Sequence, residues 1–91
     1  GADRIYGGDG DDQIYGGPGN DLLVGDAGND TLWGEDGLDE LRDFSGNNVF
    51  YGGPGGDKLY DGPGNSLLDG RDGNDVLNAA EGDDTLYGGL G

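Results

Sequence analysis

The chain has 91 residues, of which 20 are acidic and only 4 basic, and its formal net charge of −16 argues against nucleic-acid binding. It contains no cysteine and no histidine, which excludes disulfides and the usual ligands of zinc, copper and haem. No apolar run is long enough to span a membrane, so we expect no membrane span.

Three columns of residues repeat with a period of nine. Glycine recurs without exception at Gly1, Gly10, Gly19, Gly28, Gly37, Gly46, Gly55, Gly64, Gly73, Gly82 and Gly91. Four places after the first ten glycines stand Ile5, Ile14, Leu23, Leu32, Leu41, Phe50, Leu59, Leu68, Leu77 and Leu86. Two places after the glycine stand eight acids, Asp3, Asp12, Asp21, Asp30, Asp39, Asp57, Asp75 and Asp84. A fixed period predicts a solenoid, because each repeat buries its apolar residue only against neighbouring repeats.

Each repeat predicts a turn followed by a short strand. If the recurrent glycine is the fourth place, the first six places form the turn, where glycine permits positive φ, and the last three form the strand. In chain order, the strands are expected at residues 4–6, 13–15, 22–24, 31–33, 40–42, 49–51, 58–60, 67–69, 76–78 and 85–87. No segment has a period of 3.6 residues, so we expect no helix.

Strand alternation turns the eighth place inward and the seventh and ninth places outward. Two repeats then make one coil, and strands 18 residues apart pair in parallel about 4.8 Å apart. The sequence therefore predicts an all-β parallel solenoid of about five coils, a single module over residues 1–91. Because Gly1 and Gly91 both stand in the middle of a repeat, we expect a fragment of a larger chain, with the rest of the parent protein stacking on both open ends.

One buried side chain per nine residues cannot offset the entropy lost on ordering so glycine-rich and acidic a chain. Stacked aspartates would also repel one another without a counter-ion. The available donors are carboxylate and carbonyl oxygens, which are the ligands of a hard cation such as calcium. The sequence therefore predicts that calcium supplies the missing stabilisation.

The two edges of the predicted solenoid differ. One edge, here called the intact edge, carries Asp3, Asp21, Asp39, Asp57 and Asp75 at the sixth place. The other, the variant edge, carries Asp12, Asp30, Asn48, Ser66 and Asp84. The variant edge also replaces the first-place glycine by Asp43, Asp61 and Ala79, and the second-place glycine by Phe44. Drift, altered packing around Phe44 and Phe50, and a partner surface could each explain these departures. We favour drift or packing over a dedicated site.

The pattern Gly-Gly-x-Gly-x-Asp-x-U-x, in which U is large and apolar, is clearest at residues 7–15 and 52–60. It resembles the RTX nonapeptide repeats of secreted bacterial proteins, a motif associated with calcium. The resemblance implies a parallel β-roll in which sixth-place aspartates bridge ions between coils. Backbone carbonyls of the turns would complete each shell, at residues such as Gly8, Gly10, Gly17, Gly19, Gly28, Gly37, Gly53, Gly55, Gly73 and Gly82.

We expect about five strong calcium sites, in the gaps between coils that have two sixth-place aspartates. Four of these gaps lie on the intact edge, the one between Asp3 and Asp21 being weaker, and the fifth lies between Asp12 and Asp30. Asn48 and Ser66 are expected to be weaker ligands because neither carries a charge. The gap between them should be the emptiest.

The ninth place is rich in aromatic residues, and Tyr15, Trp33, Tyr51 and Tyr87 share one column, interrupted by Asp69. We expect a cross-strand ladder there; the alternative is a contact surface for a glycan or a protein.

No nucleophile and base form a credible pair, so we expect no enzyme activity. The residues predict a module that folds on binding calcium, and the resemblance to RTX repeats implies that it is a secreted, extracellular bacterial module that folds after type I secretion of a larger protein. The alternatives are a carbohydrate- or surface-binding module and a spacer in an adhesin.

Overall fold

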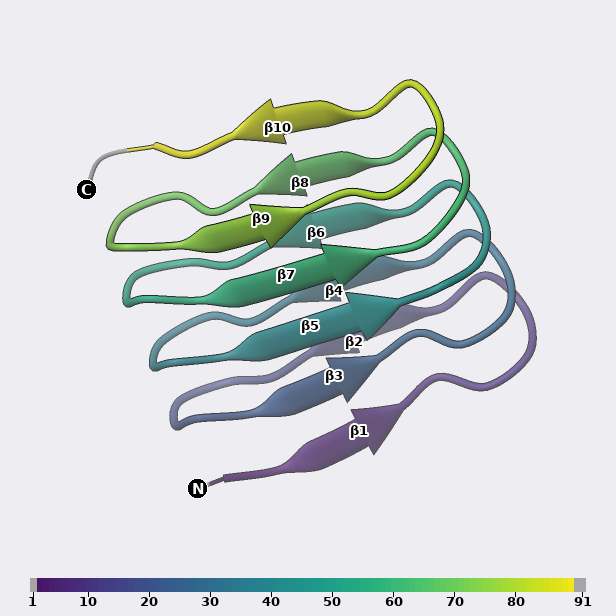
Figure 1. Cartoon of the computed structure of the whole chain (residues 1–91). Coiled ribbons are helices and arrows are strands. Elements are labelled where there is room, and N and C mark those ends of the chain that lie inside the picture. The colour runs from purple at the N-terminus through teal and green to yellow at the C-terminus, as the bar shows by residue number, and fades with distance from the viewer. Residues whose placement is uncertain (1, 90–91) are drawn as a thin grey trace.

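The computed structural model describes residues 2–89 as ten short strands joined by turns (Figure 1). The strands are β1 (Arg4–Tyr6), β2 (Gln13–Tyr15), β3 (Leu22–Val24), β4 (Thr31–Trp33), β5 (Glu40–Asp43), β6 (Val49–Tyr51), β7 (Lys58–Asp61), β8 (Leu67–Asp69), β9 (Val76–Asn78) and β10 (Thr85–Tyr87). Gly1 and Gly91, the two ends of the predicted glycine column, lie outside the described residues.

The strands form two parallel sheets that face each other, as Figure 1 shows. Sheet A contains the odd-numbered strands in the order β1-β3-β5-β7-β9, and sheet B contains the even-numbered strands in the order β2-β4-β6-β8-β10. Leu23 lies opposite Ile5 on one side and Leu41 on the other, an offset of one coil each way. This register confirms the parallel β-roll with two repeats per coil. No helix occurs in residues 2–89, so none of them forms a membrane-spanning helix.

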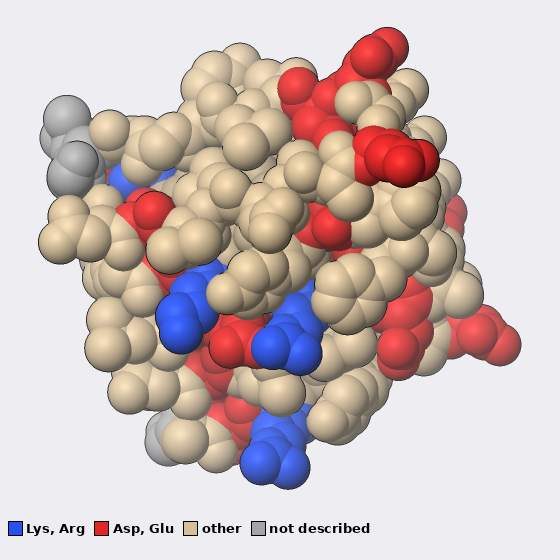
Figure 2. All heavy atoms as spheres, in the orientation of Figure 1, with Lys and Arg blue, Asp and Glu red and all other residues tan. Residues whose placement is uncertain are grey.

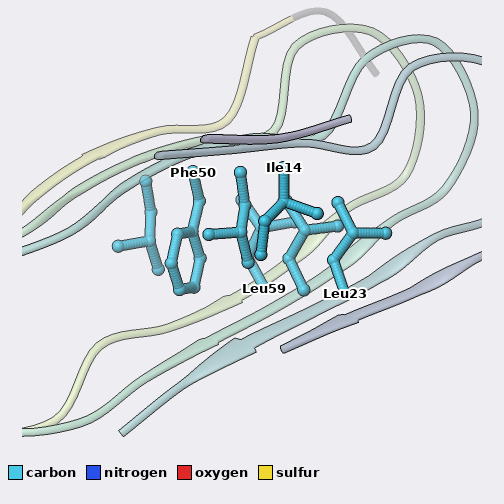
Figure 3. Close-up of a cluster of buried hydrophobic side chains, with 7 residues drawn as sticks. Ile14, Leu23, Phe50 and Leu59 are labelled. Carbon is cyan, nitrogen blue, oxygen red and sulfur yellow. The ribbon is translucent and has the colours of Figure 1, made fainter. Parts of the chain in front are cut away.

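The eighth-place column forms the core between the two sheets (Figure 3). Ile14, Leu23, Leu32, Leu41, Phe50, Leu59 and Leu68 are buried. Ile5 and Leu77, in the outermost strands of sheet A, are half-buried, and Leu86 in β10 is 46% exposed. Burial therefore decreases toward the ends of the stack, as expected for a solenoid, although Ile14 in the outermost strand β2 is still buried.

The invariant fourth-place glycine has two structural reasons. Gly28 has a φ of 116°, which side chains of L-residues rarely adopt. A Cβ atom there would also clash with the carbonyl oxygen of Gly10 in the preceding coil. The coils therefore approach too closely at this place for any residue larger than glycine.

The predicted aromatic ladder is present on the outer face of sheet B. The rings of Tyr15 and Trp33 stack with centroids 4.3 Å apart, and those of Trp33 and Tyr51 stack at 5.8 Å. The guanidinium of Arg71 lies 4.8 Å from the centre of the Tyr51 ring. The column therefore ties three neighbouring strands together.

Candidate metal centre

The sixth-place side chains point inward from the turns, because they lie two residues before the eighth place and so share its face. The Oδ1 atom of Asp39 accepts a hydrogen bond of 2.8 Å from the backbone N–H of Asp21, one coil earlier. Asp57 accepts the equivalent bond from Asp39 at 2.8 Å, and on the variant edge Asp30 accepts one from Asp12 at 2.7 Å. One oxygen of each of these carboxylates therefore links two coils.

The second oxygen of these carboxylates has no partner. Buried Oδ2 atoms without a hydrogen bond occur at the sixth-place residues Asp12, Asp21, Asp30, Asp39, Asp57 and Asp75, and also at Asp43 and Asp61. A buried carboxylate oxygen without a donor or a counter-ion is energetically costly. These oxygens therefore require a proton or a cation.

The unpartnered oxygens border small spaces that exist because the first place is glycine. The position that a Cβ would take at Gly34 lies 2.6 Å from Asp39 Oδ2 and 2.7 Å from the carbonyl oxygen of Gly52, in the next coil. The equivalent position at Gly16 lies 3.0 Å from Asp21 Oδ2 and 2.7 Å from the Gly34 carbonyl oxygen. Carboxylate and carbonyl oxygens from successive coils thus converge.

The same arrangement recurs at Gly52 on the intact edge, where the Cβ position lies 2.6 Å from Asp57 Oδ2 and 2.8 Å from the Gly70 carbonyl. On the variant edge it recurs at Gly7, with Asp12 Oδ2 at 2.8 Å and the Gly25 carbonyl at 2.9 Å. We call each of these spaces a cradle. The polar atoms that line them are all oxygens, with one unpartnered carboxylate oxygen each, and this donor set fits a hard cation.

Burial changes the acidity of these groups. Burial is the main cause that raises the pKa of Asp39 to about 7, with smaller contributions from the Asp57 and Asp21 carboxylates. Burial also raises the pKa of Asp57 to about 6 and raises that of Asp75. Without a cation, burial thus favours the protonated form of these three carboxyl groups.

The basic side chains do not neutralise the columns. Figure 2 shows the blue side chains over the face of sheet A and most of the red ones at the edge formed by the turns that follow the odd-numbered strands. Arg4, Arg42 and Lys58 lie at outward places of β1, β5 and β7. Arg42 pairs with Glu40 on the same strand and lies beside the ring of Tyr60.

Other predicted ligands occupy different environments. Asp3 is exposed, and Asp84 uses its Oδ1 to accept the N–H of Ser66 at 2.8 Å. Asn48 Oδ1 accepts the N–H of Asp30 at 2.8 Å, and the Ser66 hydroxyl oxygen accepts the N–H of Asn48 at 2.9 Å. Asn48 and Ser66 therefore keep the hydrogen bond between coils but carry no unpartnered carboxylate oxygen.

First-place carbonyls, which the sequence analysis did not name, also border the cradles. Fourth-place carbonyls lie against the glycine of the next coil, Gly10 O against Gly28 and Gly19 O against Gly37. The second- and fourth-place carbonyls stay predicted ligands. The sequence carries a signal for the first place in its own column of glycines, Gly7, Gly16, Gly25, Gly34, Gly52, Gly70 and Gly88. No group of three or more acidic side chains in residues 2–89 is arranged to hold a metal.

A second ladder at the fifth place was missed by the sequence analysis. On the variant edge, the Oδ1 atoms of Asp11, Asn29, Asn47 and Asn65 each accept the backbone N–H of the residue 18 places later, at 2.7–2.8 Å. The signal was the recurrence of Asn and Asp directly after the glycine column. These bonds need no cation, so they support the edge that has lost sixth-place carboxylates.

A family model described as the RTX calcium-binding nonapeptide repeat, in four copies, matches residues 1–23, 15–42, 24–59, 43–73 and 60–91. Together these matches extend over the whole chain. No curated protein and no solved structure matches it.

Proposed function

The chain belongs to the family of RTX calcium-binding nonapeptide repeats, and we propose that it is a module that folds on binding calcium outside the cell. Members of this family are structural calcium-binding modules and are typically secreted. In this proposal the module has no catalytic activity and supports the secretion and folding of a larger bacterial protein that leaves the cell by type I secretion.

The observation that carries the proposal is the set of unpartnered Oδ2 atoms at the cradles. When bound, calcium supplies positive charge that these buried oxygens can share between coils. Asp21, Asp39 and Asp57 hold neighbouring coils by their Oδ1 atoms and offer their Oδ2 atoms to the cradles. Without calcium, folding would bury a column of like charges or force them to take up protons.

The balance between repulsion among buried carboxylates and calcium binding suits a protein that must stay unfolded during secretion and fold afterwards. At low calcium, a net charge of −16 and 24 glycines favour an extended chain. At millimolar calcium, binding free energy becomes folding free energy, because the cradles exist only when successive coils are stacked. We propose that this difference confines folding to the outside of the cell.

The aromatic column gives weaker support to a carbohydrate-binding function. Trp33 lies between Tyr15 and Tyr51, with stacking contacts on both faces of its ring. A sugar would need such a face free for stacking. The aromatic column is therefore better explained as a ladder that joins neighbouring strands. The other alternative, a spacer in an adhesin, gives no reason for the cradles.

Circular dichroism and calcium binding test the proposal together. In EGTA the spectrum should be that of a disordered chain, and millimolar calcium should produce a β-sheet spectrum that added chelator reverses. Magnesium should substitute poorly because it demands tight octahedral geometry and loses water reluctantly. Identical spectra in EGTA and in calcium would refute calcium-driven folding, and a dialysis experiment without bound calcium would refute the proposed function altogether.

A further inference from the structure

Two repeats of the variant edge carry aspartate at the first place, where the cradle glycine is expected. These are the repeats at residues 43–51 and 61–69, with Asp43 and Asp61. They are also the two repeats whose sixth place has lost its carboxylate, at Asn48 and Ser66. Each of these repeats has therefore exchanged a sixth-place carboxylate for a first-place one.

The exchange alters the local backbone. Asp43 and Asp61 extend β5 and β7 to four residues each and pair with one another in register. The N–H of Gly62 donates to the carbonyl oxygen of Asp43 at 2.9 Å, continuing the ladder by one residue. The strand thus carries the first-place side chain inward, and Asp43 is completely buried.

The Asp43 carboxylate reaches into the cradle of the preceding coil. The Oδ2 atoms of both Asp43 and Asp30 lie within 2.6 Å of the position that a Cβ would take at Gly25. Neither Oδ2 atom has a hydrogen-bond partner. Their Oδ1 atoms are already used, since Asp43 accepts the N–H of Ser45 at 3.3 Å and Asp30 accepts that of Asp12 at 2.7 Å. Two buried carboxylates therefore direct unpartnered oxygens into one space.

Asp61 provides an internal comparison, because it holds the same place one coil later. Its Oδ1 accepts a hydrogen bond of 3.1 Å from the side-chain Nδ2 of Asn48. The same Nδ2 donates to the carbonyl oxygen of Ser45 at 3.0 Å. The Asn48 side-chain amide thus donates a hydrogen bond to Asp61, whereas within residues 2–89 no side-chain amide donates to the Asp43 carboxylate.

We propose that Asp30 and Asp43 form a further cation site for a hard divalent ion of the calcium class, in which the Asp43 side chain acts as a ligand outside the repeat pattern. The next gap, between Asn48 and Asp61, has one carboxylate instead of two. The Asn48 amide donates to Asp61 Oδ1, and although Asp61 Oδ2 is also unpartnered, we expect no ion there because the second carboxylate is missing. This proposal rests on the proposed calcium-binding function. It changes the expected ion pattern, because the gap after Asp30 becomes a full two-carboxylate site despite Asn48.

Counting bound calcium in matched variants tests the site. Wild type, Asp43→Asn and Asp61→Asn are dialysed against saturating calcium, checked for folding by circular dichroism, and analysed for calcium per chain. Asp43→Asn should bind one ion fewer than wild type, and Asp61→Asn should bind the same number as wild type. An unchanged count for folded Asp43→Asn would overturn the site, and so would the loss of one ion in Asp61→Asn.

If Asp43→Asn does not fold, wild-type crystals soaked in terbium decide the question. An anomalous peak in contact with the Oδ2 atoms of Asp30 and Asp43 would support the site. Peaks confined to other cradles would overturn it and leave the proposed function standing. Wild-type protein that binds no calcium in dialysis would instead refute the proposed function itself.

Discussion

Replacing Asp39 by asparagine separates the two roles of its carboxylate. The amide oxygen can still accept the N–H of Asp21, a bond of 2.8 Å in the native chain. The charge and the unpartnered Oδ2 atom are lost. Asp39→Asn should therefore act in opposite directions with and without calcium.

The effect without calcium follows from the pKa of Asp39. Burial raises this pKa from 3.8 to about 7. The folded-state pKa lies above the ordinary value, so the calcium-free fold keeps its full stability below pH 3.8. That stability is lost as the pH rises through about 7, because the unfolded chain releases the Asp39 proton more readily than the folded chain does. Through Asp39 alone, the calcium-free fold should be roughly 2 kcal/mol less stable at pH 7 than at pH 5. At pH 7, the buried Asp39 makes the calcium-free fold roughly 4 kcal/mol less stable than it is below pH 3.8.

The asparagine carries no such pH-dependent cost, although burying its unpaired NH2 group costs about 1–3 kcal/mol. The calcium-free Asp39→Asn fold should thus be roughly 1–3 kcal/mol more stable than wild type at pH 7. With calcium the sign reverses, because ligand charge sets affinity, and the calcium midpoint should rise several-fold.

Far-UV circular dichroism measures both effects. Trimethylamine N-oxide stabilises folded states, so the calcium-free protein is titrated with it at pH 5 and pH 7 until it folds, and the concentration needed is compared. Calcium titrations at pH 7 give the calcium midpoint. Asp36→Asn is the matched control, since it removes the same charge from an exposed place in the same turn. If both variants show the same calcium midpoint and the same pH dependence, Asp39 is not a ligand and the reasoning fails.

Three further outcomes are expected. Gly34→Ala would put a methyl group into a cradle, 2.6 Å from a carboxylate oxygen, and should raise the calcium midpoint, whereas Gly88→Ala, with no atom within 4 Å, should leave it unchanged; equal midpoints would contradict the cradle. Gly55→Ala should prevent folding at any calcium concentration, because its φ is 112° and its Cβ would meet a carbonyl of the preceding coil; a native spectrum in calcium would disprove this. Asn29→Ala removes one fifth-place bond and should lower the melting temperature in saturating calcium by roughly 4–8 °C, for a loss of about 1 kcal/mol; an unchanged melting temperature would show that the ladder contributes nothing.

The edges of the roll use different means to hold their coils together. On the intact edge, the carboxylates of Asp21, Asp39 and Asp57 combine hydrogen bonds with cradles whose unpartnered oxygens need a proton or a cation. The variant edge also has cradles, at Gly7 and Gly25, but there the fifth-place ladder and the amide of Asn48 add bonds that need no cation. Because coils stack as a one-dimensional array, a loss at one gap should weaken its neighbours as well.

The sequence by itself determined the architecture. A period of nine places each residue beside the one 18 places later, so the pairing of Leu23 with Ile5 and Leu41 follows directly from the count. Alternation along each strand then puts the eighth place in the core and the sixth-place aspartates on the same inner face. These are local and periodic properties, which need no knowledge of how the turns pack.

Only the tertiary structure decided which oxygens meet. The sequence predicted second- and fourth-place carbonyls as ligands, which stays a prediction, and it did not indicate that first-place carbonyls border the cradles. The direction of each carbonyl depends on the turn and on the coil stacked above it. The same holds for Asp43, which the sequence shows only as a departure from glycine. Its carboxylate faces Asp30 because β5 continues for one residue and because Gly25 leaves space in the preceding coil. That contact joins residues of different repeats, and it forms only when the coils close on one another.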